Sequence, residues 1–435
     1  MKIISYKDIN FAEEIDLLTS RVAFPQEIAE PVKNILDDIK HRGSSAIIEY
    51  ALKFDNAQLD ISSFRVSDKE ISEAYKKIDS ITKDSIETAI INVTEFAKKQ
   101  LPKNWSFSPR HGVTLGEKFE PLDRIGAYVP GGTAPLVSTV IHTIAIAKAA
   151  GVKEIVAVTP PGKDAIIIPE LLYAMKEAGA TEIYRLGGVY GIGALAYGTE
   201  TIKKVGKIVG PGNAYVTAAK KYVYGDVAID MIAGPSEIMV IADENNNPDF
   251  IAADILSQAE HGSGHEHAVL VTDSKTLIAK VKASIKKQAA KLSRKGPIKT
   301  VLANGVFLIQ VKNMGQAVEI ANSYAPEHLE IMCTDADNLA QRVKAAGAIF
   351  IGEYTPEPVG DFVAGPSHVL PTGGSAKYFS GLTVTSFLRR TSLIKYDKQA
   401  LEKEIPAIEK FASMEGLDAH GNSALIRFNK YTGVS

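Results

Sequence analysis

The alternation of apolar runs with helical patterns between Ile125 and Ile351 is the feature that most restricts how this chain can fold. Runs that are typical of strands occur at residues 125–129, 152–158, 182–186, 207–209, 227–232, 238–241, 268–271, 306–311, 328–332 and 348–351. Helical patterns lie between most of these runs. Strands that alternate with helices predict parallel sheets with right-handed crossovers. We therefore expect an α/β protein.

The segments on either side of this region follow different patterns. Residues 1–23 are expected to form an arm with little core of its own, and residues 25–100 carry apolar side chains at helical spacing. Residues 352–374 are rich in glycine and proline, and a helical tail follows them. Because 435 residues exceed one ordinary hydrophobic core, we expect two or three closely apposed domains.

The composition argues against several classes of protein. With 49 basic and 51 acidic residues, the chain lacks the net positive charge that is typical of nucleic-acid-binding proteins, although a local basic patch stays open. The first residues mix charges and predict no signal peptide. No apolar stretch reaches the about 20 residues of a membrane helix. The single cysteine, Cys333, excludes an internal disulfide and fits a cytoplasmic location.

The string SQAEH at residues 257–261 lies between an apolar helical run and a predicted strand. Gln258 and His261 are three residues apart, so a helix that continues this far places both side chains on one face. An amide oxygen and an imidazole on one face can share a metal ion, although such a pair more often packs or forms hydrogen bonds. His265 and His267 follow, either as spare ligands or as ordinary loop and strand residues.

Three glycine-containing loops lie at the starts of predicted helices, at residues 131–133, 191–196 and 210–213. Backbone N–H groups at the start of a helix favour phosphate, and residues 191–196 fit the G-x-G-x-x-A pattern of dinucleotide sites. However, no acidic residue ends a second strand at the expected spacing. Nucleotide binding and a purely structural role in turns and caps therefore both remain open.

Three further polar motifs come later in the chain. Glu327 and His328 follow a proline at the start of a predicted strand, where a carboxylate can activate water and an imidazole can take up a proton. Asp361 lies in a glycine-flanked loop, and Glu415 and His420 lie in the tail. Each motif alone also fits a surface loop, a turn or a helix end. We assign structural roles to three other candidates, namely Cys333, His111 and His142.

Seven separated strings resemble the histidinol dehydrogenase family, in order and over nearly the whole chain. The strings are GAYVPGGTAPLVSTV, KIVGPGNAYVTAAK, DMIAGPSEIMVIAD, DILSQAEHG, YAPEHLEI, GDFVAGPSHVLPTGG and EGLDAHGNSALIR. The resemblance implies a zinc ion with two oxygen and two nitrogen ligands, namely Gln258, Asp361, His261 and His420. It also implies a homodimer in which His420 and Glu415 serve the active site of the neighbouring subunit.

The reaction that the resemblance implies is the oxidation of L-histidinol to L-histidine, with two molecules of NAD+ reduced in succession. His328 would be the general base for the alcohol proton, and Glu327 would activate water for the second oxidation. Zinc would hold the substrate in place. The implied contacts to the substrate are Ser236, Gln258, His261, Glu327, His328, Asp361, His368, Glu415 and His420, and those to NAD+ are Tyr128, Tyr190 and Asn213.

The chain departs from the family pattern at two positions. Tyr190, in the string GGVYG, stands where the family usually has a glutamine that contacts NAD+, and Phe362 lacks the hydroxyl of the usual tyrosine. These departures motivate one rival, a zinc- and NAD-dependent dehydrogenase of the same superfamily that acts on another small polar alcohol. A zinc hydrolase and a metabolite-binding relative without catalysis are further alternatives.

Under this resemblance we expect two Rossmann-like parallel-sheet domains of an incomplete dinucleotide-fold type. Residues 1–23 would form an N-terminal helical arm. Residues 24–124 and 237–380 would form the first α/β domain, with most of the zinc-binding and catalytic residues, and residues 125–236 would form the second, which binds NAD+. Residues 381–435 would form a small helical tail domain that reaches the partner subunit.

Overall fold

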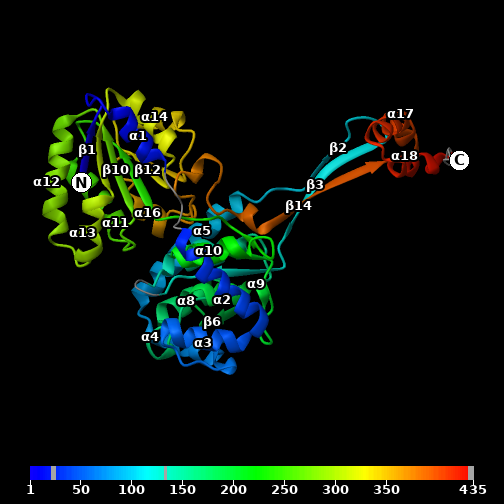
Figure 1. Ribbon diagram of the computed structural model, residues 1–435, viewed down its shortest axis with the longest axis horizontal. Helices are drawn as coiled ribbons and strands as arrows, with labels where there is room; N and C mark the ends of the chain where they lie inside the picture. The colour runs from blue at the N-terminus through cyan, green and yellow to red at the C-terminus, as the bar shows by residue number, and fades with distance from the viewer. Residues whose placement is uncertain (21–25, 132–134, 430–435) are drawn as a thin grey trace. The chain divides into compact units, whose positions relative to one another are not determined.

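The protein, seen in a computed structural model, forms two compact units (Figure 1). The structure describes residues 1–20, 26–131 and 135–429. The first unit comprises Met1–Gln100 and Leu122–Phe387, and the second comprises Leu101–Pro121 and Leu388–Ser435. Two parallel sheets lie in the first unit, which confirms the expected α/β class. The site described below lies entirely within this unit.

The larger sheet of the first unit has six parallel strands (Figure 1). Their spatial order is β1 (Lys2–Ser5), β11 (Val306–Gln310), β10 (His267–Thr272), β9 (Glu237–Ile241), β12 (His328–Ile331) and β13 (Ala348–Ile351). Residues 1–20 of the segment expected as an arm supply the edge strand β1 and the helix α1 (Phe11–Thr19), and residues 21–23 of that segment lie outside the described residues. Figure 1 shows the helices on either side of this sheet.

Successive side chains of these strands enter two different cores, because strand residues alternate between the faces of a sheet. Ile238 and Val240 of β9 belong to one buried cluster, and Met239 and Ile241 belong to the other. The first cluster includes side chains of α11 (Pro248–Ala259), α12 (Lys275–Ala289) and α13 (Lys295–Asn304). The second includes side chains of α1, α14 (Met314–Tyr324) and α15 (Ala336–Arg342). Burial on both faces explains the consecutive apolar residues in the central strands β9 and β10.

The smaller parallel sheet has five strands. Their order is β6 (Glu182–Tyr184), β5 (Glu154–Val158), β4 (Arg124–Tyr128), β7 (Lys207–Val209) and β8 (Ala228–Ile229). One buried cluster joins this sheet to four helices, namely α2 (Ala29–Arg42), α3 (Ser44–Asp55), α9 (Gly188–Tyr197) and α10 (Ala214–Val223). Residues 24–124 were expected to group with residues 237–380, but α2 and α3 pack in the core of this sheet instead. The four-part division of the chain as a whole stays a prediction.

A second group of helices lies in the same unit. It comprises α4 (Asp68–Lys77), α5 (Ser80–Lys99), α8 (Pro169–Ala178) and a continuous helical stretch made of α6 (Val137–Val140), the π-helical η3 (Ile141–Ala145) and α7 (Ile146–Ala149). This stretch contacts both α5 and α8, and its central turn is fully buried. A π-helical turn contains one residue more than an α-helical turn, and such turns are uncommon in proteins.

The second unit carries an antiparallel sheet of three strands. Their order is β14 (Leu388–Tyr396), β3 (Val113–Pro121) and β2 (Trp105–Phe107), and the helices α17 (Lys398–Glu415) and α18 (Asp418–Leu425) follow. The small strands expected in residues 104–120 are present. The strand β14 was not expected in the tail; it forms because all nine of its residues pair with β3, far away in the sequence.

The remaining elements are short. They are η1 (Gln26–Ile28), η2 (Ile61–Ser63), η4 (Lys163–Ala165), α16 (Glu357–Phe362), η5 (Ser375–Lys377), η6 (Val384–Phe387) and η7 (Ile426–Phe428). Among the described residues, every helix is too short or too polar to cross a membrane.

Candidate active site

The candidate site lies at the amino ends of the strands of the six-stranded sheet. His328, His267 and Glu237 are the first residues of β12, β10 and β9, and these three strands are neighbours. Open α/β sheets more often bind ligands at the carboxyl ends. Here the end of α11 and the short helix α16 supply further polar side chains at the amino edge.

Gln258 and His261 lie side by side, as their spacing predicts. Gln258 is in the last turn of α11 and is fully buried, and its Nε2 lies 3.3 Å from Nδ1 of His261. The Oε1 atom of Gln258 has no hydrogen-bond partner among the described residues. His261 follows the helix end and keeps part of its surface exposed, yet desolvation lowers the pKa of its ring. A neutral imidazole and an unbonded amide oxygen are both suited to bind a metal ion.

Asp361 and Glu357 lie one turn apart on α16, beside His261. One donor atom from each of these three residues lies within 4.8 Å of the other two. Glu357 was not among the predicted ligands. Its Oε1 is buried without a partner, and burial, together with the charge of Asp361, raises the pKa of Glu357 to about 8. Glu330 of β12 fixes the start of α16, because its Oε1 accepts a 2.7 Å hydrogen bond from the backbone N–H of Glu357.

A strained turn places Glu327 and His328 at this edge. Ala325 ends α14 with φ 52°, a left-handed conformation that is uncommon for alanine, and a proline follows it. The Oε2 atom of Glu327 accepts a 2.9 Å bond from the backbone N–H of Glu237. Nδ1 of His328 lies 3.0 Å from the backbone oxygen of Glu237, so Nδ1 carries the proton. Its Nε2 therefore remains as the proton acceptor of the neutral ring.

The charges around His328 are closely coupled. Nε2 of His328 lies 3.5 Å from Oδ1 of Asp361, and Nδ1 lies 3.7 Å from Oε2 of Glu327. Burial lowers the pKa of His328, but the two carboxylates outweigh it and raise that pKa to about 10. Burial raises the pKa of Glu327 to about 8. Burial also opposes ionisation of Asp361, yet the imidazoles of His328 and His368 hold the pKa of Asp361 well below its usual range.

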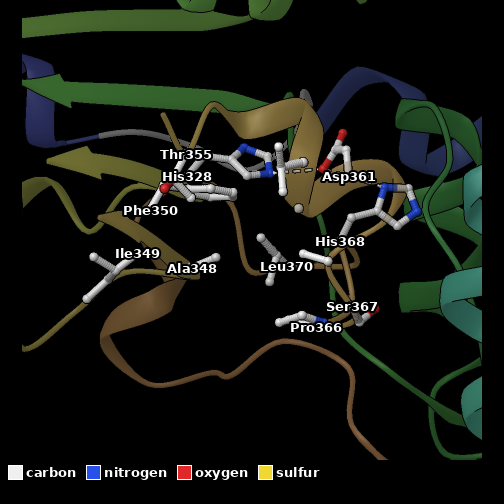
Figure 2. Close-up of a pocket in the computed structure, with 13 residues that line it drawn as sticks. His328, Ala348, Ile349, Phe350, Thr355, Asp361, Pro366, Ser367, His368 and Leu370 are labelled. Carbon is white, nitrogen blue, oxygen red and sulfur yellow. Dashed lines mark ion pairs between the residues drawn. The ribbon is translucent and has the colours of Figure 1, made fainter. Parts of the chain in front are cut away.

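Three of these residues, His328, Asp361 and His368, line a cavity of about 150 Å³, a volume that can hold one aromatic ring. Gln258, His261, Glu327 and Glu357 are not among its lining residues. Figure 2 shows His328, Asp361 and His368 along its upper part and Leu370 and Pro366 below them. Nδ1 of His368 lies 3.8 Å from Oδ1 of Asp361. The cavity is thus mainly apolar, with a few polar groups close together on one wall, which is typical of small-molecule sites.

The other predicted contacts lie outside this cavity. Ser236 precedes β9, and its backbone oxygen accepts a 3.2 Å bond from the N–H of His267. Tyr128 ends β4 and Asn213 caps α10. Tyr190 is buried, and its hydroxyl donates to Asp55. Glu415 and His420 are exposed and belong to the second unit, and Gly132 and Thr133 of the first glycine loop lie outside the described residues.

Comparison with known proteins identifies the family. The family model described as histidinol dehydrogenase matches residues 19–428. The chain belongs to the histidinol dehydrogenase family. Among its relatives, a histidinol dehydrogenase from Heliobacterium mobile is 44% identical over 430 residues, which cover 99% of this chain and 100% of the relative. One from Clostridium acetobutylicum is 47% identical over 402 residues, with 92% and 93% covered.

A solved structure agrees with this family assignment. The crystal structure of histidinol dehydrogenase from Elizabethkingia anophelis superposes with a TM-score of 0.93 and 36% sequence identity, and 99% of this chain and 98% of that chain are covered. Histidinol dehydrogenases are NAD-dependent oxidoreductases that use a metal ion, so the chain is an enzyme of this class. The donor atoms of His261, Glu357 and Asp361 form a possible site for that metal.

Proposed function

We propose that the chain oxidises L-histidinol to L-histidine through bound L-histidinaldehyde, with two NAD+ reduced in succession, as the last step of histidine biosynthesis in the cytoplasm. One observation carries this proposal: the unbonded Nε2 of His328 lies 3.5 Å from Asp361, whose carboxylate converges with His261 and Glu357. A potential base thus lies directly beside a potential metal site. Membership of the family supports the substrate and the reaction.

We propose that the metal is zinc and that Gln258, His261 and Asp361 bind it, with His420 of the partner subunit as a fourth ligand. The buried, unbonded Oε1 of Gln258 supports this ligand set, and so does the close approach of His261 and Asp361. Amide and carboxylate oxygens and imidazole nitrogens are donors that zinc accepts. When bound, zinc supplies a Lewis-acidic centre that can hold the amine and imidazole of the substrate.

In this proposal His328 takes the hydroxyl proton of the substrate on Nε2 while a hydride passes to NAD+. The bond from Nδ1 to the backbone oxygen of Glu237 keeps Nε2 as the acceptor. The neighbouring carboxylates favour a protonated ring, and a cation held by Asp361 would offset their attraction and favour the neutral ring that a base requires. His328 returns its proton to solvent before the second oxidation.

Glu327 acts in the second half of the proposed reaction. Its carboxylate takes a proton from water as the water oxygen attacks the aldehyde carbon, and it then gives this proton to the former carbonyl oxygen, which yields the hydrate and restores the carboxylate. His328 then takes a hydroxyl proton of the hydrate while the second hydride passes to NAD+, and the carboxylic acid is formed. The hydrogen bond from the backbone N–H of Glu237 holds the carboxylate of Glu327 in place for this step.

We propose that NAD+ binds at the carboxyl ends of β4 and β7, beside the start of α10. Dinucleotides commonly bind at such an edge. Gly210 has φ 112°, and a Cβ there would lie 2.2 Å from the backbone oxygen of Tyr128, so glycine is required in this turn. Asn213 begins α10, and its Oδ1 accepts bonds from the backbone N–H groups of Tyr215 and Val216. A contact from Tyr190 to NAD+ stays a prediction.

Replacement of Glu327 by glutamine tests both the proposed function and the separate roles of His328 and Glu327. The wild-type enzyme is expected to form two NADH per L-histidinol, because both oxidations run to completion. The Glu327→Gln variant keeps the bond from Glu237 but cannot accept a proton, so we expect one NADH per substrate and accumulation of aldehyde. A spectrophotometric endpoint with limiting histidinol and an aldehyde trap measures both quantities.

The same assay separates the rival functions. A wild-type enzyme that forms NADH from another small alcohol but not from histidinol would favour the related dehydrogenase, for which Tyr190 and Phe362 are the motivating departures. No NADH from any alcohol would favour a hydrolase or a binding protein. Two NADH from the Glu327→Gln variant would show that another group activates the water.

We further propose a homodimer whose subunits share active sites through His420. The exposure of His420 and Glu415 supports this proposal, because neither side chain is buried within its own subunit. His420→Ala is expected to lower zinc affinity by about 10- to 100-fold, as measured by competition with a chelator. Heterodimers of His420→Ala and Asp361→Asn subunits should regain about one intact site. If the heterodimers regain no activity, His420 acts within its own subunit.

A further inference from the structure

His142 is a buried imidazole that the reaction proposed above does not use. It lies in the π-helical turn η3, inside an otherwise apolar helical stretch, and it is completely shielded from solvent. Neither ring nitrogen forms a hydrogen bond of standard geometry among the described residues, although the backbone of Asp361 and Pro366 lies close to the ring. Burial and the nearby His368 lower the pKa of His142 to about 3, so the ring is neutral. An unbonded polar group in a core costs free energy, so a residue that only fills space would be expected to be apolar.

The ring of His142 meets the wall of the active-site cavity. Its centroid lies 4.7 Å from that of His368, with 54° between the two planes, and a tilted contact of this kind is favourable between aromatic rings. The two chain segments are also joined next to this contact, because Oγ of Ser367 donates a 3.1 Å bond to the backbone oxygen of His142. His142 thus lies directly behind a residue that lines the cavity.

His368 depends on its neighbours for a fixed orientation. Its Nδ1 lies 3.8 Å from Oδ1 of Asp361, and its Nε2 is buried without a hydrogen-bond partner among the described residues. Figure 2 shows the ring of His368 beside the carboxylate of Asp361. The ion pair alone is long and leaves the ring able to rotate. The contact with the buried ring of His142 restricts that rotation.

We propose that His142 is a positioning residue, which holds the ring of His368 in the orientation that binds the substrate. The proposal rests on the proposed function, in which His368 contacts histidinol. In this arrangement His142 touches neither substrate nor metal and acts through its ring contact with His368. The proposal also accounts for the uncommon π-helical turn, because the extra residue of such a turn changes the direction in which side chains such as that of His142 point.

A double-mutant cycle with a matched control tests the proposal. His142→Leu keeps a similar volume and removes the ring, and His142→Gln serves as a second variant in case leucine disturbs the fold. We expect the KM for histidinol to rise about 10-fold in His142→Leu, with little change in kcat. In a His368→Ala background the same change should have no further effect. Thr143→Val is the control, since Thr143 is buried in the same turn and, among the described residues, its hydroxyl donates only to backbone oxygens of its own helix.

Thermal stability distinguishes positioning from packing. Because leucine removes two unbonded nitrogens, the midpoint of thermal unfolding should stay the same or rise in His142→Leu. A lower midpoint with an unchanged KM would overturn the proposal in favour of a packing role. An equal rise of KM in the wild-type and His368→Ala backgrounds would overturn it as well, because His142 would then act independently of His368.

A readout without substrate separates this proposal from the proposed function. In ¹⁵N-labelled enzyme loaded with zinc, the ring nitrogens of His368 are expected to give one sharp set of signals, assigned by comparison with His368→Ala. His142→Leu should shift or broaden these signals, and Thr143→Val should not. Unchanged His368 signals in His142→Leu would overturn the proposal. If the signals change but the wild-type enzyme does not oxidise histidinol, the proposed function fails while the positioning role stands.

Discussion

Replacing His328 by asparagine is expected to lower kcat about a thousandfold while the metal content per subunit stays the same. The amide N–H of asparagine can still bond the backbone oxygen of Glu237, as Nδ1 does at 3.0 Å, so the strand edge is preserved. The proton acceptor Nε2 is lost, and general base catalysis contributes about 10² to 10⁴ in rate. Steady-state kinetics and elemental analysis of the purified variant measure the two quantities.

The exposed His265 provides the control for this change. His265→Asn removes a histidine from the same loop region as the proposed ligands, and it should leave both turnover and metal content unchanged. Loss of the metal from His328→Asn, with retention in His265→Asn, would contradict the assignment of His328 as the base, since it would then serve as a ligand or as direct support for one.

Asp361→Asn is expected to remove the metal and to lower kcat/KM by more than about a thousandfold, because this one carboxylate lies beside four other polar residues of the site. It converges with His261 and Glu357, and its Oδ1 lies 3.5 Å from His328 and 3.8 Å from His368. Equilibrium dialysis gives the metal affinity, and kinetics at saturating zinc give the remaining activity. Asp337→Asn, at an exposed position of α15, is the control for an ordinary loss of charge.

The same variant predicts the direction of a pH shift. The carboxylate of Asp361 raises the pKa of His328, because a negative neighbour favours the protonated ring. Without that charge the pKa of His328 falls, so the ring loses its proton at lower pH. The acidic limb of the residual kcat profile at saturating zinc should therefore move to lower pH in Asp361→Asn. An acidic limb that moves to higher pH would exclude His328 as the titrating base.

The sequence predicts the parallel sheets well because burial leaves a strong local signal. The strands β5, β9 and β10 lie in the middle of their sheets, and each contains four consecutive apolar residues, whereas Glu330 interrupts the apolar pattern of β12. The strand β14 carries no such signal, since most of its residues are exposed and its pairing with β3 joins distant segments. The packing of α2 on the five-stranded sheet is likewise invisible in the sequence, where only the apolar period of the helix can be seen.

The site divides in a similar way. The spacing of Gln258 and His261 predicts that they lie together, because residues three apart in a helix lie on the same face. Glu357 was missed, although its position four residues before Asp361 puts both on one face of a helix, because residues 352–374 show no helical pattern. The role proposed for His142 depends on its contact with His368, which is more than two hundred residues away in the chain. Whether His420 joins the set depends on a second subunit.

The arrangement of α11 and α16 has a mechanical consequence. Under the proposed ligand set, a metal ion bound by Gln258, His261 and Asp361 would link the end of α11 to the short helix α16, which lies far along the chain. Such a tie closes a long loop and lowers the entropy of the unfolded chain, as a disulfide does in secreted proteins. With Cys333 as its single cysteine, this chain has no covalent crosslink of its own. The ion would then act as a reversible crosslink, and the segments that carry the catalytic groups would become more rigid when the metal binds.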